Sequence, residues 1–360
     1  MALIALVATA ASLLGAVQRG CKTGDVFTNG DDDFSLLRIP ANCTMLDLDL
    51  RGIGVDGAAA FGKALGGNTG LITLSLYEGE MGPGGAAALA EALKVNVALT
   101  TLTLHNNKLG DNGAALLAGG LHHNTALTTL CLDNNGIGVK GATSIAEALR
   151  INSALTSLTV RNNEVGDLGA VAFAGALKLN RALTTLYLWE NKIHASGAAA
   201  IARALEDNTV LKWLVLSNND VGGDGVAIEG VTAIAQALKV NTALTTLSLW
   251  NNSIDDRGAT AIAEALKANA ALVSLRLGNN KIGGGAATAF VEALKVNPVL
   301  TRLDLNGNTN LKGSSTSALA SIELFLTDNK DPRKRVAEKE AVRKARTYQP
   351  SRLHRGGNEF

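Results

Sequence analysis

The sequence predicts an α/β solenoid of about ten repeats, in which each repeat is a short strand followed by a helix. Three observations predict this fold class. A pair of apolar residues two positions apart returns every 28 residues, apolar and polar residues alternate around each pair as in a strand, and apolar residues four positions apart follow it as in a helix. One such unit cannot bury its apolar face alone, so the units must stack into a continuous core. We therefore expect one elongated domain in this chain of 360 residues, although the length alone would suggest two or three.

A leucine opens the apolar pair of every predicted strand. The steps between these leucines are 28 residues, except for a step of 33 that places a five-residue insertion within residues 221–230. The ten opening residues are Leu46, Leu74, Leu102, Leu130, Leu158, Leu186, Leu214, Leu247, Leu275 and Leu303.

The repeat that begins near Leu102 shows how each element follows from the sequence. Leu102 and Leu104 alternate with polar residues, which predicts a strand with its leucines on one face. Gly113, Leu117 and Leu121 follow at four-residue steps, which predicts a helix.

The repeat domain is expected to span residues 31–326. Residues 31–43 look like half a repeat that caps the first strand, and residues 314–326 form an irregular last helix. A basic tail follows at residues 327–360, and residues 1–30 form an apolar N-terminal segment and a linker.

Composition excludes several classes of protein. Hydrophobic residues make up 47% of the chain, and its 39 glycines show no three-residue period, so neither a disordered nor a collagen-like body is expected. Residues 1–328 hold 23 basic and 28 acidic residues, a net charge of −5, so the repeat body is not expected to bind nucleic acid.

The N-terminal segment leaves the compartment of the protein open. Its apolar stretch is too short and too rich in alanine for a membrane span. The segment lacks the basic residues that usually begin a signal peptide, so a cytoplasmic location is favoured. Secretion is the alternative if residues 1–16 act as a signal peptide, with residues 8–10 as a small-residue cleavage site.

The oxidation state expected for the cysteines depends on the compartment. None of Cys21, Cys43 and Cys131 has the spacing of a metal site, so no metal is expected. In a secreted chain Cys21 and Cys43 could form a disulfide, and Asn42 and Asn251 would become glycosylation acceptors. In a cytoplasmic chain all three cysteines would be reduced thiols.

The pattern LxxLxLxxNxL with a 28-residue period resembles the leucine-rich repeats of the ribonuclease-inhibitor class, which occur also in Ran GTPase-activating proteins and NOD-like receptors. The resemblance covers roughly residues 43–326 and implies a horseshoe with a parallel inner sheet and outer helices. It also implies that the asparagine of the pattern is buried and bonds to the backbone of neighbouring turns. Only Arg51 and Gly79 depart from it; the matching residues are Asn107, Asn135, Asn163, Asn191, Asn219, Asn252, Asn280 and Asn308.

Two glycine-rich motifs look like nucleotide sites but are better explained by the repeat. Residues 52–57 match the GxGxxG dinucleotide pattern, yet the pattern returns at residues 136–141, so the glycines follow the repeat period. Residues 15–23 approach a P-loop but have a cysteine where the lysine must stand. We therefore expect no cofactor and, since no catalytic motif appears, no enzyme activity.

A binding site is expected on the concave face, where the residues between the leucines point away from the core. All three tryptophans fall there, on three consecutive strands, in a chain with only 4% aromatic residues. Exposed aromatic residues also favour strands without any function, but clusters of Trp, Tyr and Arg are typical of binding hot spots. The predicted site residues are Tyr187, Trp189, Trp213, Trp250, Arg161, Arg276, His105 and Asp133.

The predicted function is that of a monomeric scaffold that binds a protein or peptide on this face. The insertion at residues 221–230 is expected at the rim, beside Trp213 and Trp250. The family resemblance implies two alternatives, a GTPase activator for a Ran-like small GTPase and an innate-immune type recognition module. Inhibition of a ribonuclease is disfavoured, because that inhibitor is rich in cysteine and strongly acidic.

Overall fold

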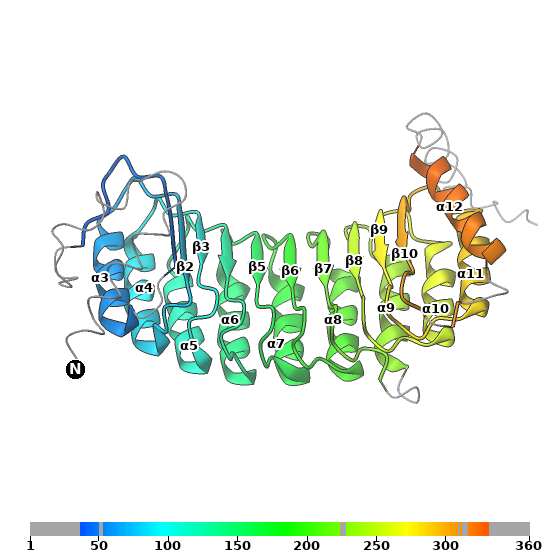
Figure 1. Ribbon diagram of the computed structural model, residues 1–360, viewed down its shortest axis with the longest axis horizontal. Coiled ribbons are helices and arrows are strands. Elements are labelled where there is room, and N and C mark those ends of the chain that lie inside the picture. Colours follow the sequence, from blue (N-terminus) through cyan, green and yellow to red (C-terminus); the bar gives the residue numbers. More distant parts are fainter. Residues whose placement is uncertain (1–36, 50–52, 224–227, 309, 312–315, 331–360) are drawn as a thin grey trace, which may run out of the picture.

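The chain folds into a curved solenoid in which ten strands alternate with ten helices over the described residues (Figure 1). The computed structural model describes residues 37–49, 53–223, 228–308, 310–311 and 316–330. The strands are β1 (Met45–Asp49), β2 (Thr73–Tyr77), β3 (Thr101–Thr103), β4 (Thr129–Cys131), β5 (Ser157–Thr159), β6 (Thr185–Tyr187), β7 (Trp213–Val215), β8 (Thr246–Ser248), β9 (Ser274–Arg276) and β10 (Arg302–Asp304).

A helix follows each strand and leads back to the next one. The helices are α3 (Gly54–Gly66), α4 (Gly82–Val95), α5 (Gly110–Leu121), α6 (Val139–Ile151), α7 (Gly166–Leu179), α8 (Ala195–Asp207), α9 (Glu229–Val240), α10 (Asp256–Leu266), α11 (Gly284–Leu294) and α12 (Thr316–Lys330). None of these described helices is both long and apolar enough to cross a membrane.

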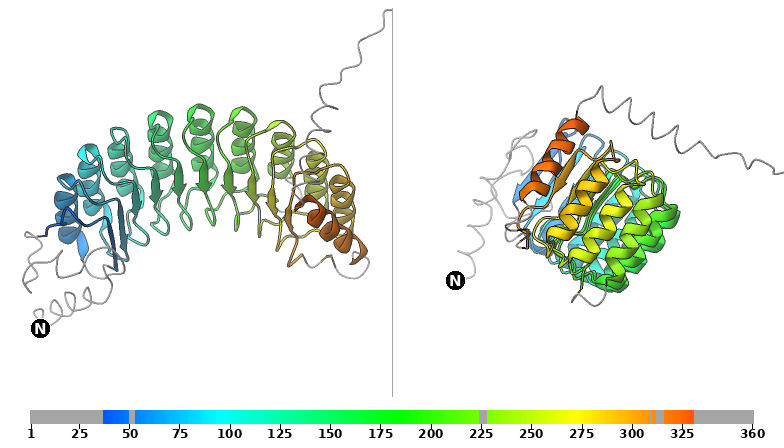
Figure 2. Two further views of the ribbon diagram at one scale, coloured as in Figure 1. Left: turned by 90° about the horizontal axis from the view of Figure 1, so that it is seen from above. Right: turned by 90° about the vertical axis from the view of Figure 1, so that its right-hand side faces the viewer.

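The ten strands form one parallel sheet in chain order, with equivalent residues of successive repeats paired. Leu74 pairs with Leu102, for example, so each leucine sits beside the leucine of the next repeat. Seen from above, the sheet lines the inner side of an arc and the helices its outer side (Figure 2). The predicted fold class is therefore confirmed.

The core lies between the sheet and the helices and runs along the whole arc. The leucines of β1 to β9 are buried, Leu303 of β10 is half-buried, and alanines on the inner faces of the helices pack in the same layer. Three helices place a phenylalanine in this layer, Phe61, Phe173 and Phe290, and each is fully buried. The helices approach closely because small residues face one another: a Cβ atom on Gly62 would lie 2.6 Å from the Ala88 carbonyl group.

The asparagine of the repeat pattern forms the expected ladder. Seven of the eight asparagines are buried, and Asn219 is half-buried. Asn107 shows the arrangement, since its side-chain amide donates to the Leu76 carbonyl at 2.8 Å and its side-chain oxygen accepts from the Gly79 amide at 2.9 Å. Each such side chain thus joins its own repeat to the preceding one.

Different interactions stabilise the two ends of the domain. At the N-terminal end Cys43 is buried and disulfide-bonded, whereas Cys131 is a free thiol on the concave face. At the C-terminal end Asn329 in α12 donates to the carbonyl groups of Asn297 and Leu300. Cys21, most of the predicted N-terminal cap and the basic tail beyond Lys330 lie outside the described residues.

Candidate functional site

The concave face carries the side chains that alternate with the buried leucines. In β3 to β6 the central leucine is buried and the residue on each side of it is partly exposed. Six of these eight positions hold Thr or Ser, and the other two are Cys131 and Tyr187. Because parallel strands lie only about 4.8 Å apart, small side chains fit together there and leave any larger one prominent.

Tyr187, Trp189, Trp213 and Trp250 stand out from this background, and we call them the aromatic surface. Tyr187 ends β6 and Trp189 follows it, Trp213 begins β7, and Trp250 follows β8. Trp213 is 47% exposed and Trp250 is 37% exposed, while Tyr187 and Trp189 are half-buried. The structure therefore brings the four predicted aromatic residues onto one face of three adjacent strands.

The aromatic surface extends along the full length of the strands. In the sheet Trp213 pairs with Thr185 on one side and Thr246 on the other, which places it at the beginning of the strands. Trp189 and Trp250 lie beyond the opposite end. The described residues that follow β7 leave the sheet at the end where Trp250 lies, whereas Trp213 begins that strand. Part of the insertion lies outside the described residues, so its expected place beside Trp213 and Trp250 stays a prediction.

Small residues occupy the area between the aromatic side chains. Val215 is half-buried, and Ser217 and Ser248 are buried with their hydroxyl oxygens 2.7 Å apart. Because one of these hydroxyls donates to the other, part of their hydrogen-bonding capacity is satisfied within the protein. Trp250 lies against Gly278 of the next repeat, where a Cβ atom would come within 2.8 Å of its indole ring.

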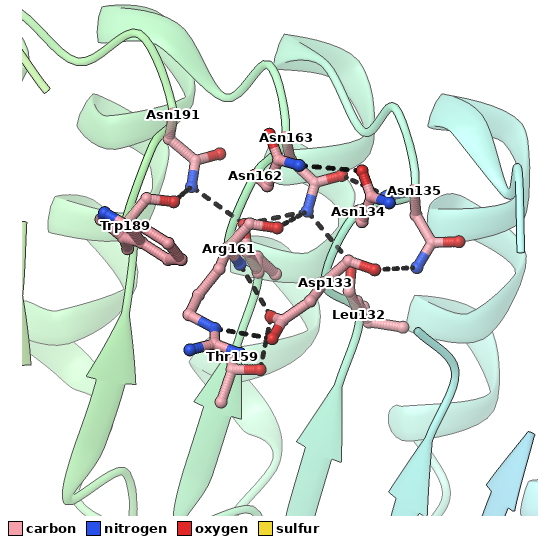
Figure 3. Close-up of polar contacts among 11 residues, drawn as sticks. Leu132, Asp133, Asn134, Asn135, Thr159, Arg161, Asn162, Asn163, Trp189 and Asn191 are labelled. Atoms are coloured by element: carbon pink, nitrogen blue, oxygen red, sulfur yellow. Dashed lines mark hydrogen bonds and ion pairs between the residues drawn. The ribbon is translucent and has the colours of Figure 1, made fainter. Parts of the chain in front are cut away.

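A buried carboxylate positions one side of the aromatic surface (Figure 3). Asp133 is 3% exposed and accepts three hydrogen bonds, from the Thr159 hydroxyl at 2.6 Å, the Arg161 backbone amide at 2.8 Å and the Arg161 Nε at 2.7 Å. The guanidinium carbon of Arg161 then lies 5.6 Å from the centre of the Trp189 ring. This chain of contacts crosses three strands and holds Trp189 through a cation–π contact.

The remaining predicted residues lie apart from this network. Arg276 is exposed at the end of β9, where it pairs in register with Ser248, and it forms no ion pair with a described residue. His105 lies three repeats before Trp189 and contacts Tyr77, with ring centres 6.4 Å apart. His105 is therefore not part of the aromatic surface.

Comparison with known proteins identifies the repeat. A family model described as "Leucine Rich repeat" matches residues 95–118, 123–146, 152–174, 207–227 and 240–263. The chain contains leucine-rich repeats. The ribonuclease-inhibitor class is a finer assignment that stays a prediction, and no curated protein sequence matches the chain.

Solved structures with similar folds are related only distantly. The leiomodin-1 actin-binding site 2 is 21% identical with a TM-score of 0.37, and the match covers 57% of this chain and 97% of that one. A tropomodulin C-terminal domain from Caenorhabditis elegans is 13% identical with a TM-score of 0.35, over 57% and 97% of the two chains. TLR13 in its complex with ssRNA13 is 18% identical with a TM-score of 0.43, over 72% and 32%. No functional conclusion follows from likeness at this level.

The leucine-rich repeats contain a second column of buried asparagines that sequence analysis missed. Asn180 shows the arrangement: it follows a helix, donates to two carbonyl groups of the preceding repeat and accepts from the backbone amides of Ala182 and Leu183, which lead into the next strand. The signal is visible in the sequence as an asparagine three residues before a leucine, repeated with the same period. The buried residues of this column, each of which accepts from two backbone amides, are Asn68, Asn96, Asn124, Asn152, Asn180, Asn208, Asn241, Asn269 and Asn297.

Aspartates cap helices of the following repeat, which sequence analysis also missed. Asp111, Asp167 and Asp256 each accept backbone hydrogen bonds at the beginning of the next helix, at distances between 2.7 and 3.1 Å. Burial raises the pKa of Asp167, but bonds from Ser196 and from two backbone amides outweigh it and lower that pKa. The ionised carboxylate therefore stabilises the junction between repeats, and this contribution is lost as the pH falls through the lowered pKa.

The glycine-rich motifs fit a structural role where they are described. Gly54 has a positive φ angle of 61°, as do Gly82, Gly110 and Gly166 at the equivalent position of other repeats. Gly136 has a φ of 65° at the position where the preceding repeat has Lys108 with a φ of 54°. Left-handed turns of the repeat thus account for these glycines without a nucleotide. Gly52 and the near P-loop at residues 15–23 lie outside the described residues. Among the described residues no cluster of His, Cys, Asp and Glu could hold a metal ion.

Proposed function

We propose that the protein is a scaffold that binds another protein or a peptide through the aromatic surface on its concave face. The observation that carries this proposal is the exposure of Trp213 and Trp250 within a field of small polar residues. A tryptophan left 47% exposed costs solvation free energy that a partner would recover by covering it. Interfaces concentrate their binding energy in a few such aromatic residues.

The Asp133–Arg161 pair supports the same proposal by preparing the surface for binding. Arg161 is held by a buried carboxylate and in turn contacts the Trp189 ring. A side chain that is already ordered loses less conformational entropy when it enters an interface. Trp189 is therefore suited to act as an anchor beside the more exposed Trp213 and Trp250.

Replacing Trp189, Trp213 and Trp250 together with Ser is expected to abolish capture of the partner from a lysate of the source organism. The sheet should remain folded, because none of the three indoles lies in the buried core. The measurement is affinity capture followed by mass spectrometry, with circular dichroism as the test of folding.

The matched control replaces three exposed apolar residues on the outer side of the arc, by Leu168→Ser, Leu179→Ser and Val240→Ser. These helix residues are 69%, 53% and 58% exposed. The control should capture the same partner as the unmodified protein. A partner that the triple tryptophan variant still captures would refute the proposal.

The two alternatives that the resemblance implies use the same scaffold and stay predictions. A GTPase activator would accelerate GTP hydrolysis by a small GTPase in a purified mixture, whereas a recognition module would not. That assay separates the two once a partner is captured.

The disulfide at Cys43 supports the secreted alternative for the location of the protein. Disulfides form and persist mainly in oxidising compartments, and the predicted glycosylation acceptors Asn42 and Asn251 are both exposed. We therefore propose an oxidising compartment in place of the cytoplasmic location that the N-terminal segment favoured.

Alkylation of the denatured but unreduced protein is expected to label Cys131 and leave Cys43 unlabelled. Denaturation matters because burial raises the pKa of the Cys131 thiol in the folded protein and so limits its reaction. Peptide mass spectrometry of protein isolated from its source reads out the labels. Labelling of Cys43 before reduction would contradict the disulfide, and labelling of both after reduction is the internal control.

A further inference from the structure

The two arginines that flank the aromatic surface differ in their availability to a partner. The Nε atom of Arg161 donates to Asp133 at 2.7 Å, so the pair has no net charge and the guanidinium group rests on Trp189. Arg276 is exposed and forms no ion pair with a described residue. An acidic group on a partner would therefore be attracted to Arg276 more strongly than to Arg161.

The register of the sheet fixes where Arg276 lies relative to the small residues of the aromatic surface. Val215, Ser248 and Arg276 are direct neighbours on β7, β8 and β9. A line across the strands from Val215 to Arg276 crosses two strand spacings, which is about 10 Å. On its other side Arg276 is in register with Asp304 of β10, but no ion pair joins these two described residues. Arg302 is exposed at the beginning of β10, in register with Ser274.

The backbone N–H and C=O groups of the strands on this face are not available for hydrogen bonds to a partner. Each strand from β2 to β9 is paired on both sides, so no sheet edge is free at the aromatic surface. A partner must then be recognised by side chains, and a segment that needs no backbone bonding partners is favoured. The polyproline II conformation has this property, because its backbone groups remain solvated. It is also the conformation that aromatic-lined surfaces commonly recognise.

The polyproline II repeat matches the spacing on the protein. It has three residues per turn and a rise of about 3.1 Å per residue, so residues i and i+3 project from the same side about 9 Å apart. Residues of a β-strand that share one side would be about 7 Å or 13 Å apart, which fits the two strand spacings less well.

We propose that the concave face binds a polyproline II segment in which a large apolar side chain is followed or preceded, at three residues' distance, by an acidic side chain. The apolar side chain covers Val215, Ser217 and Ser248 between the aromatic rings, and the carboxylate pairs with Arg276. This inference rests on the proposed function and specifies the chemistry of its partner.

Selection from a displayed library of random peptides tests the inference. The unmodified protein, the triple tryptophan variant, Arg276→Gln and the control Arg150→Gln are the targets. Arg150 is exposed at the end of α6 on the outer side, so the control removes the same charge elsewhere. We expect peptides with an apolar and an acidic residue three positions apart, enriched in proline, on the unmodified protein and on Arg150→Gln.

Each variant should change a different part of that result. Arg276→Gln should lose the acidic preference and keep the apolar one, and a synthetic peptide with Leu-Pro-Pro-Glu should bind it about 3- to 10-fold more weakly than it binds the unmodified protein. A partly exposed charged hydrogen bond accounts for a loss of that size. The triple tryptophan variant should enrich no related peptide.

The failures of the two proposals are distinguishable. Peptides that depend on the tryptophans but carry no acidic residue at that spacing, or are unchanged by Arg276→Gln, would overturn this inference and leave the proposed function standing. A preferred spacing of two would indicate a β-strand segment and would equally overturn it. Enrichment that ignores the tryptophans altogether would count against the proposed function as well.

Discussion

Replacing Asn180 with Ala is expected to lower the free energy of unfolding by about 4 kcal/mol or more. Asn180 is 4% exposed and makes four hydrogen bonds to backbone groups. Its amide donates to the carbonyl groups of Leu149 and Asn152 at 2.6 and 3.0 Å, and its oxygen accepts from the amides of Ala182 and Leu183 at 2.9 and 2.7 Å. Alanine would leave all four buried groups without a partner, at about 1 kcal/mol or more each.

The position of Asn180 in the middle of the solenoid enlarges the effect. Each repeat of a solenoid is stabilised mainly by its neighbours, so a weak junction divides the array into two parts. The urea transition followed by circular dichroism should therefore become broader, as well as moving to lower urea.

The matched control for this prediction is Asn162→Gly. Asn162 is exposed, and among the described residues its side chain bonds only to Asn134, to which its amide group donates. Its φ is positive, 51°, which glycine tolerates. The control is expected to change the free energy of unfolding by less than about 1 kcal/mol. Equal losses in Asn180→Ala and Asn162→Gly would contradict the role assigned to the buried column.

Replacing Asp133 with Ala is expected to cost about 2–4 kcal/mol of stability and to release Trp189. The carboxylate is buried and takes bonds from Thr159 and from two nitrogen atoms of Arg161. The Thr159 hydroxyl and the Arg161 backbone amide would lose a charged acceptor. The Arg161 side chain is 46% exposed, so its guanidinium group would turn to solvent. The estimate allows for that exposure, since water screens part of the ion pair.

Two measurements check this prediction. Urea denaturation reports the stability, and the indole resonance of Trp189 in an NMR spectrum, assigned with Trp189→Phe, should broaden or shift when its cation–π contact is lost. The control is Asp304→Ala, which removes a half-buried carboxylate from the same face and one hydrogen bond to the Asn306 amide at 3.0 Å. An unchanged Trp189 resonance in Asp133→Ala would show that Asp133 does not position the ring.

Local patterns in the sequence were enough to predict most of the fold and part of the site. The alternation around Leu102 predicted a strand, and the four-residue steps that follow predicted the helix, because each pattern reports which side of one element is buried. The same argument placed Trp189, Trp213 and Trp250 on the concave face. The resemblance added the buried role of Asn107 and its equivalents.

Contacts between repeats could not be predicted in the same way. Asp133 and Arg161 were both expected to face a partner, yet they pair with each other, because residues 28 positions apart become neighbours in the sheet. Asn180 and its column were overlooked, because a polar residue between two elements looks like an ordinary loop until its partners are known.

The sequence by itself determined the solenoid, its period and the face on which the aromatic residues lie, because these depend only on which residues of each repeat avoid water. The tertiary structure alone decided which charges are satisfied within the protein and which stay available. That distinction rests on distances between side chains of different repeats. Examples are the Asp133–Arg161–Trp189 contacts and the exposed Arg276, which forms no ion pair within the described part of the chain. The chemistry expected of a partner depends on it, since only a charge without an internal partner can attract one outside.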